Sequence, residues 1–215
     1  MNKIPEIVLQ SFKTDLESIE RVSTNTANVT TPGFKAYLNT SSSVDNSQGE
    51  LKKTSRPMDI AIDGSGWFVA RNGSSMILTR NGQFHRNAEG FLSTMSGYVL
   101  QGYSGDIFVG DGKLSLGQEG QILIDDTVLD KFLISTPTNS QLEKYKNGEI
   151  QLNLSEKLNI SENSVLRQSY VEQSNVQPSD SVLQMMLLNK HTQTMQKTYQ
   201  TYNQIIQKTI SDLGK

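Results

Sequence analysis

The sequence predicts an α+β protein in which a small antiparallel β domain is inserted between two long terminal helices. Near both ends of the chain, apolar residues recur at spacings of three and four, the period of an amphipathic helix. Between the ends, short runs alternate apolar and polar residues and are separated by Asn-Gly and similar pairs, which indicate strands joined by tight turns. The 215 residues suffice for one large domain or two small ones.

The N-terminal helix is expected within residues 1–35. Its apolar seam consists of Val8, Phe12, Ile19, Val22 and Val29, with Asp15 and Thr26 at the remaining seam positions. Pro32-Gly33 ends this helix, because proline disfavours the helical conformation in the residue before it.

The C-terminal helix is expected over residues 180–215. Its seam steps by three and four residues through Met185, Leu188, Thr192, Met195, Tyr199, Tyr202, Ile206, Thr209 and Leu213. Pro178 and Asp180 suit the first turn of a helix, and Gly214 suits its C-terminal cap.

The β domain is expected over residues 58–168. Met58, Ile60 and Ile62 alternate with polar or small residues in its first strand. Further strands are predicted at Trp67–Arg71, Met76–Arg80, Gln83–Arg86, Phe91–Met95, Tyr98–Gln101, Ile107–Val109, Gln121–Ile124, Val128–Ser135 and Glu149–Leu154. Many short strands with turns between them predict a small antiparallel sheet structure.

Two segments, at residues 36–57 and 169–179, show neither the helical spacing of three and four nor the alternation of a strand. They are expected to be extended connectors. Gly33 lies where the chain leaves the first helix and must turn sharply. If the turn requires a positive φ, a β-branched residue at Gly33 would misdirect Phe34 while the β domain stays folded.

Neither helix seam is apolar enough to support a free-standing helix. Asp15, Thr26, Thr192 and Thr209 interrupt the seams, and uncharged glutamines crowd the other faces of the C-terminal helix. A free-standing coiled coil normally carries charged pairs beside its seam. Uncharged faces suit helices that are surrounded by other helices, so the sequence indicates a subunit of an assembly.

Composition excludes several classes of protein. Lys and Arg total 20 and Asp and Glu total 22, so there is no general basic excess for binding nucleic acid or a membrane surface. Without cysteine and with only two histidines, disulfides, thiolate sites and a histidine metal cage are not expected. No apolar run is long enough to span a bilayer or to serve as a cleaved signal peptide.

No catalytic constellation is expected. Asp59, Asp63 and the pair Asp125-Asp126 are carboxylates of the kind that act in glycoside hydrolysis, but strand and turn positions explain them more simply. Ser65 lies between glycines without the spacing of a nucleophile elbow. The chain has no phosphate-binding glycine motif. We therefore predict a protein that is not an enzyme and binds no cofactor and no metal.

Four sequence blocks resemble the flagellar rod and hook family. The first is NTANVTTPGFK at residues 25–35, which is similar to the signature that ends the N-terminal helix of that family. TSRPMDIAIDGSGWFV follows at 54–69, and TRNGQF with GFLSTMSGYVLQG lies between 79 and 102. The last is VEQSNVQPSDSVLQM at 171–185. The blocks occur in the order of the family. Asn189-Lys190-His191-Thr192 differs from the usual Gln-Arg-aromatic stretch, and residues 125–169 carry little resemblance.

The resemblance implies a non-enzymatic structural subunit of the bacterial flagellar basal body. It implies that the two helices form an antiparallel coiled-coil-like pair lining an inner tube, with the β domain outside. It also implies export through the flagellar type III apparatus without a cleaved signal, assembly into the periplasmic rod, and rod and hook subunits as partners. The implied assembly residues are Val8, Phe12, Ile19, Val22, Asn25, Ala27, Asn28, Val29, Gly33, Phe34, Ser174, Asn175, Val176, Met185, Leu188, Met195, Tyr199, Tyr202, Ile206 and Leu213.

Within the family, the segments TPGFKAYLN, SRPMD and NVQP are most similar to proximal-rod subunits of the F type. Distal-rod subunits of the G type and hook-type subunits are the nearest alternatives. A rival from another class is a secreted cell-wall hydrolase or binding module, which would use an aromatic groove drawn from Trp67, Phe68 and Tyr98.

Overall fold

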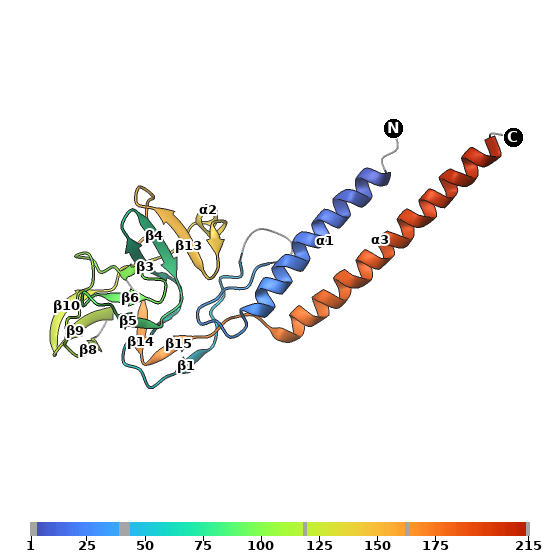
Figure 1. Ribbon diagram of the computed structural model, residues 1–215. Helices are drawn as coiled ribbons and strands as arrows, with labels where there is room; N and C mark the ends of the chain where they lie inside the picture. The colour runs from blue at the N-terminus through green and yellow to red at the C-terminus, as the bar shows by residue number, and fades with distance from the viewer. Residues whose placement is uncertain (1–3, 39–43, 118–119, 162–163, 214–215) are drawn as a thin grey trace. The chain divides into compact units, whose positions relative to one another are not determined.

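The computed structural model describes residues 4–38, 44–117, 120–161 and 164–213. The chain divides into two compact units, one containing both chain ends and the other spanning Asn28–Val176. The first unit is helical, and the second consists mainly of antiparallel strands. The predicted α+β class is therefore confirmed, with an N-terminal helix and a C-terminal helix flanking the strands (Figure 1).

The helical unit contains α1 (Ile4–Ala27) and α3 (Pro178–Leu213). α1 ends two residues before Val29, because Asn28 begins a turn. In that turn the backbone N–H of Thr31 donates to the Asn28 carbonyl at 3.2 Å, and the Thr31 hydroxyl donates to Asn28 Oδ1 at 3.0 Å. Pro32 follows and prevents the helix from resuming. Neither helix is long and apolar enough to cross a membrane.

Within the helical unit, α1 and α3 lie side by side and run in opposite directions (Figure 1). The buried side of α1 consists of Val8, Asp15, Ser18, Val22 and Asn25. On α3 the seam residues Met185, Leu188, Thr192, Met195 and Tyr202 are half-buried. α1 thus buries polar Ser18 and Asn25, whereas Thr26, which the period had placed in the seam, is exposed. A regular coiled-coil pairing stays a prediction.

The second unit, which we call the β unit, is organised around an eight-stranded antiparallel sheet. Its path runs β12-β13-β4-β3-β7-β6-β5, and β11 also pairs with β3. The strands are β3 (Trp67–Asn72), β4 (Ser75–Thr79), β5 (Phe84–Arg86), β6 (Leu92–Thr94), β7 (Val99–Leu100), β11 (Ile134–Ser135), β12 (Tyr145–Lys146) and β13 (Glu149–Asn153).

Three smaller sheets and a short helix complete the β unit. A three-stranded sheet has the order β10 (Thr127–Lys131), β9 (Gln121–Ile124), β8 (Leu114–Leu116). The two-stranded sheets pair β14 (Val165–Gln168) with β2 (Ile60–Asp63), and β1 (Leu51–Lys53) with β15 (Tyr170–Glu172). The helix is α2 (Asn139–Leu142).

The segments expected to be connectors belong to the β unit as far as Val176, and Pro178 and Ser179 at the end of the second segment lie in α3. β1 comes from the first of them and β15 from the second, and the two strands pair directly, with Leu51 opposite Glu172. Strands of three residues are too short to show period two in a sequence. The strand expected at Ile107–Val109 forms only an isolated bridge, between Phe91 and Phe108. Gly105 and Gly110, both at positive φ, turn the chain on either side of it.

Two of the predicted Asn-Gly pairs lie at hairpin turns, but only one of them forms the whole turn. Between β12 and β13, Asn147 and Gly148 have φ values of 54° and 88°, as a type I′ turn requires. Between β3 and β4 the turn is Gly73-Ser74, with Gly73 at a φ of 56°, and Asn72 still belongs to β3, opposite Ser75. The first turn sets the register of β12 against β13, and the second sets that of β3 against β4.

Two apolar clusters cover opposite faces of the central strands. Alternate residues of β3 point to opposite sides, so Trp67 and Val69 join one cluster while Phe68 and Ala70 join the other. The cluster around Trp67 also contains Phe34, Tyr145 and Val176, which come from both ends of the unit and from its last third. The core therefore requires residues from nearly the whole length of the β unit.

Candidate functional site: a charged clamp between the two ends of the β unit

Three charged side chains meet in the interior of the β unit and join its two ends. The Lys35 ammonium lies 2.6 Å from Glu172 Oε1, and Arg80 Nη1 lies 2.9 Å from Glu172 Oε2. None of the three side chains is more than 1% exposed. We call Lys35, Arg80 and Glu172 the clamp. Lys35 stands eight residues after the end of α1, and Glu172 ends β15, six residues before the start of α3.

Close approach of two backbone segments positions Lys35. Gly33 adopts a φ of 70°, and its N–H donates to the backbone carbonyl of Glu172 at 2.8 Å. A Cβ atom on Gly33 would lie 2.3 Å from both the carbonyl carbon of Arg80 and the backbone nitrogen of Asn81. Only glycine fits between these segments, and its turn sends Phe34 and Lys35 into the interior.

Gly49 holds the carboxylate from another side. Its backbone N–H donates to Glu172 Oε1 at 2.9 Å. A Cβ atom there would lie 2.0 Å from the carbonyl oxygen of Gln173, so this contact also depends on glycine. Glu172 is thus bound by two cations and one amide, which compensates for its removal from water.

Backbone carbonyls complete the shell of the two cations. Lys35 Nζ donates to the carbonyl of Ser47, and Arg80 Nη2 donates to the carbonyl of Gly64 at 2.6 Å. Burial lowers the pKa of the Lys35 ammonium, and the nearby Glu172 carboxylate opposes that change. Two cations and one anion leave a formal charge of +1 in the interior. The clamp is therefore stable only while all its partners are present.

Asn175 ties the same two chain segments together beside the clamp. Its side-chain oxygen accepts from the backbone N–H of Ala36 at 2.8 Å, and its Nδ2 donates to the carbonyl of Asp45 at 2.8 Å. The backbone N–H of Asn175 donates to the carbonyl of Phe34 at 3.3 Å. Ser174-Asn175-Val176 and Gly33-Phe34, predicted separately from the sequence, therefore meet at one place.

An aromatic cluster covers the clamp on the side of Phe34. The rings of Phe34, Tyr37 and Trp67 each lie within 6 Å of the Tyr145 ring, centroid to centroid. The Tyr145 hydroxyl accepts from the backbone N–H of Lys35 at 2.7 Å. Burial raises the pKa of Tyr145 well above its ordinary value.

This raised pKa predicts an alkaline loss of stability. In the unfolded chain Tyr145 loses its proton near pH 10, whereas in the β unit it keeps the proton to higher pH. Its contribution is fully present below pH ~10 and falls above it by up to about 1.4 kcal/mol per pH unit. Urea unfolding at several pH values, followed by the fluorescence of the single tryptophan, Trp67, measures this slope.

Tyr145→Phe should make the slope above pH 10 shallower. Tyr103→Phe is the matched control, because the Tyr103 side chain is exposed in the folded β unit. Equal slopes for the wild type and Tyr145→Phe would contradict the prediction. Tyr37, which is half-buried and also has a raised pKa, contributes in the same direction and is present in every variant.

The structure places the predicted assembly residues in two groups. In the helical unit, Val8, Val22 and Asn25 are buried, Ala27 is exposed, and Phe12, Ile19, Met185, Leu188, Met195 and Tyr202 are half-buried. Tyr199 and Ile206 are exposed, and the side chain of Leu213 lies outside the described part of the structure. In the β unit, Gly33, Phe34 and Val176 are buried, and Asn28, Val29, Ser174 and Asn175 are half-buried. Their role in assembly stays a prediction.

Sequence reasoning missed all three residues of the clamp. Lys35 ends the first resembling block, Arg80 lies in TRNGQF, and Glu172 lies in VEQSN. Charged residues in short polar segments are normally solvent-exposed. The sequence signal for these three residues is their position inside the blocks that resemble the flagellar rod and hook family.

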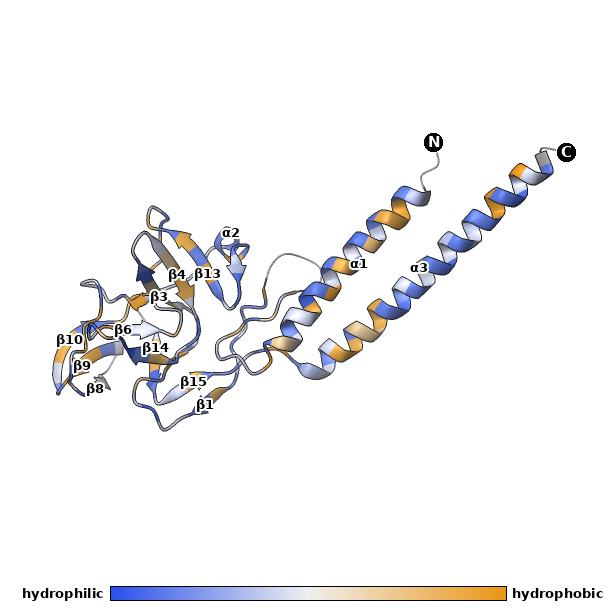
Figure 2. Cartoon of the chain, viewed as in Figure 1, coloured by the Kyte–Doolittle hydropathy of each residue, from blue (hydrophilic) through white to orange (hydrophobic). Residues whose placement is uncertain are grey.

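Exposed apolar residues of the helical unit were also missed. Val182, Leu183, Met186 and Leu187 are each more than half exposed, and they lie beside the half-buried Met185 and Leu188. The first turns of α3 are therefore apolar around most of their circumference, and Figure 2 shows apolar residues gathered there. Ile7, Leu9 and Leu16 add exposed apolar side chains on α1. Such surface on helices marks sites of association.

Three of the four suspected carboxylates have structural partners, and the fourth, Asp126, is exposed. Asp63 binds Arg167, whose Nη2 lies 2.6 Å from Asp63 Oδ2. Asp59 is buried, 3.4 Å from Arg56 Nη1, and Asp125 accepts from the backbone N–H of Lys113. Among the described residues, no group of three or more acidic or histidine side chains is placed to hold a metal ion.

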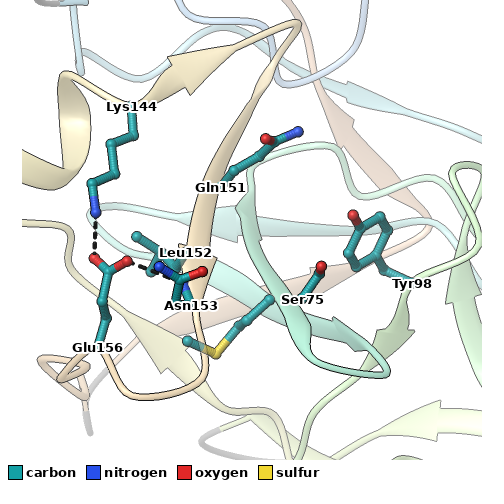
Figure 3. A pocket seen from close by; sticks show the side chains of 8 residues that line it. Ser75, Tyr98, Lys144, Gln151, Leu152, Asn153 and Glu156 are labelled. Carbon is teal, nitrogen blue, oxygen red and sulfur yellow. Dashed lines mark hydrogen bonds and ion pairs between the residues drawn. The ribbon is translucent and has the colours of Figure 1, made fainter.

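A cavity of about 420 Å³ opens beside β4 and β13, and Figure 3 shows the side chains that line it. Its carboxylate, Glu156, is bound to Lys144 at 2.7 Å and accepts from the backbone N–H of Asn153. These contacts lower the pKa of Glu156, which opposes a role as a proton donor. Tyr98 lines this cavity, whereas Trp67 and Phe68 are buried, so the three aromatic residues do not form one groove.

Two sequence models of one protein family match the chain. The model described as the flagellar hook protein FlgE/F/G D1 domain matches residues 61–163, most of the β unit. The model described as the flagellar basal body rod FlgEFG protein C-terminal matches residues 167–212, which include β15 and nearly all of α3. Glu172 therefore lies in the second match, Arg80 in the first, and Lys35 before both.

Individual relatives agree with the family match. A flagellar basal-body rod protein FlgF of Buchnera aphidicola subsp. Baizongia pistaciae is 31% identical over 130 residues, which cover 51% of this chain and 52% of that relative. The FlgF protein of Mesorhizobium japonicum is 24% identical over a match that covers 80% of this chain and 81% of that relative. A FlgG rod protein of Buchnera aphidicola subsp. Schizaphis graminum is 27% identical over a match that covers 95% of this chain and 98% of that relative.

The two sequence models together match most of the chain. The matched residues include most strands of the β unit and nearly all of α3. The relatives are named as rod proteins of both the F and the G type. The chain belongs to the family of flagellar hook and basal-body rod proteins.

Proposed function

We propose that this protein is a structural subunit of the flagellar basal-body rod, located in the basal body. Family membership supports this role, and so does the exposed apolar surface at the start of α3, because a helix apolar on most faces needs further partners. The partners are other axial subunits of the flagellum. The role requires no active site, no cofactor and no metal.

The clamp suits a subunit that bears load. Residues 33–35 and 172–175 are the two segments through which the β unit continues into α1 and α3. Buried ion pairs and backbone hydrogen bonds join these segments. A force applied to either helix is therefore shared by two segments that are bonded to each other. Subunits that contact their neighbours through two different surfaces extend as an open helix when the rotation from one subunit to the next does not close a ring. Torque would then be distributed over many parallel contacts.

The finer assignment is a proximal-rod subunit of the F type. TPGFKAYLN, SRPMD and NVQP support it, although a relative of the G type matches 95% of the chain and a relative of the F type matches 80%. Distal-rod or hook-type subunits remain the alternatives. We further propose export through the flagellar type III apparatus without a cleaved signal, a periplasmic position in the rod, and a tube lined by α1 and α3. The cell-wall hydrolase alternative has no support from the family matches.

The double variant Met186→Asp/Leu187→Asp tests the proposal. Both side chains are more than half exposed, so the variant should keep the fold of the chain while two carboxylates prevent burial of α3 against other helices. We expect loss of swimming and of complete rods in a complementation assay, with secretion unchanged. Gln193→Asp/Thr194→Asp, at exposed polar positions of α3, is the matched control and should swim. Normal rods in the Met186/Leu187 variant would contradict the proposal.

A further inference from the structure

A polar contact lies in the middle of the seam between α1 and α3. Nδ1 of His191 lies 2.9 Å from both carboxylate oxygens of Asp15, and the Thr192 hydroxyl donates to Asp15 Oδ2 at 3.2 Å. The Asp15 side chain is 8% exposed, whereas that of His191 is 51% exposed. A nearly buried carboxylate on one helix thus has its partners on the other.

The seam on either side of this contact combines apolar residues with the small polar residues Ser18 and Asn25, and its apolar pairs discriminate weakly between registers. In two antiparallel helices, a step of three or four residues on one is matched by an equal step backwards on the other. Asp15 contacts Thr192, so these two residues lie at the same level. Three residues back along α1, Phe12 then lies at the level of Met195, and seven residues forward, Val22 lies at the level of Met185. A slip of one heptad would place Phe12 at the level of Leu188 or Tyr202, which are also seam residues.

Among the described residues of the seam, Asp15 is the buried charge, and its contact distinguishes these registers most strongly. In the two slipped registers Asp15 would lie at the level of Met185 or of Tyr199, and it would lose both His191 and Thr192. A buried carboxylate without its partners is costly, and single polar residues in a seam are known to specify register for this reason. One heptad is about 10 Å along the helix, enough to change which exposed apolar residues of α1 and α3 lie beside one another.

We propose that Asp15, with His191 and Thr192, fixes the register of α1 against α3. The contact makes the native register unique at some cost in stability, in the way that a polar residue in a coiled-coil seam does. Asp15 is a positioning residue: it decides which surface the helix pair presents, and it takes no part in that surface itself.

Because the chain contains no cysteine, disulfide formation can report the register. Three double variants share Phe12→Cys and add Met195→Cys for the native register, or Leu188→Cys or Tyr202→Cys for the two slipped ones. The purified full-length chain is oxidised, and intramolecular disulfides are quantified by mass spectrometry on the monomer band. Each reporter is combined with Asp15→Leu, with Asp15→Asn, and with Glu17→Leu, which removes an exposed carboxylate of the same helix.

In the otherwise unaltered chain, and with Glu17→Leu, we expect the 12–195 disulfide to exceed either slipped pair by about tenfold or more. With Asp15→Leu the slipped pairs should rise to a comparable yield, while helix content measured by circular dichroism stays the same. Asp15→Asn should restore most of the native preference, because an amide still bonds His191 and Thr192.

Three results would overturn the proposal. The first is a native preference that persists in Asp15→Leu, and the second is slipped pairs already abundant in the unaltered chain. The third is absence of the 12–195 disulfide from the unaltered chain. A merely stabilising contact would lower helix content in Asp15→Leu without raising the slipped yields, and that outcome also counts against a role in register.

Discussion

Gly33→Val is expected to lower the free energy of unfolding of the β unit by more than about 3 kcal/mol. A positive φ alone costs a β-branched residue about 1–2 kcal/mol. Here the new Cβ would also lie 2.3 Å from backbone atoms of Arg80 and Asn81, so one of the two segments must move. That movement breaks the hydrogen bond from the Gly33 N–H to the Glu172 carbonyl and shifts Arg80 from its carboxylate.

The structure changes what this substitution is expected to do. From the sequence, Gly33 belongs to a turn between the helix and a connector, and the β domain stays folded when the turn is altered. In the structure Gly33 belongs to the β unit, and its neighbours are residues of the clamp. We therefore expect the β unit itself to be destabilised, with loss of motility as a consequence.

Gly73→Val is the matched control for Gly33→Val. Gly73 also has a positive φ, of 56°, but apart from its chain neighbours no atom of the described residues lies within 4 Å of the position of its Cβ. It should therefore show only the conformational cost of about 1–2 kcal/mol. Urea unfolding followed by Trp67 fluorescence gives both values. Equal losses at Gly33 and Gly73 would show that the close approach to Arg80 contributes nothing.

Periodicity predicted the helices well because their seams are local. The 3/4 spacing from Met185 to Tyr202 needs no knowledge of the partner helix, and these positions are indeed half-buried, apart from the exposed Tyr199. On α1 the same reasoning was less accurate, since Ser18 and Asn25 are buried and polar. A buried polar residue is specified by its partner, which a single amphipathic pattern does not contain.

The clamp shows where local reasoning ends. Lys35, Arg80 and Glu172 lie far apart in the sequence, and each stands among polar residues that give no sign of burial. Their contacts are made by three backbone segments that approach closely at Gly33 and Gly49. The resembling blocks marked the region, but the partners of each charge follow only from three-dimensional structure.

Glu172→Gln is expected to lower the free energy of unfolding of the β unit by about 3–5 kcal/mol, the usual cost of removing one partner from a buried ion pair. The substitution keeps the volume of the side chain, so no cavity contributes. It leaves Lys35 and Arg80 without a counter-charge in an interior where both side chains are at most 1% exposed. Asp63→Asn is the control, since the partly exposed pair of Asp63 with Arg167 should contribute less than about 1 kcal/mol.

Replacing all three charges at once should behave differently from replacing one. In Lys35→Met/Arg80→Met/Glu172→Met the buried charge is gone, and the free energy of unfolding should return to the wild-type value or exceed it by about 1–4 kcal/mol. The same urea titrations test both variants.

If the free energy of unfolding falls less in Glu172→Gln than in the Asp63→Asn control, Glu172 does not hold the two cations in place. If instead the triple variant is as unstable as Glu172→Gln, the cost arises from lost packing and lost backbone partners, such as Gly49 and Gly64, and not from unpaired charge. A triple variant whose free energy of unfolding recovers but whose cells do not swim would show that a stable β unit is insufficient for a working rod. In that case the charged contacts of the clamp serve to make the subunit rigid.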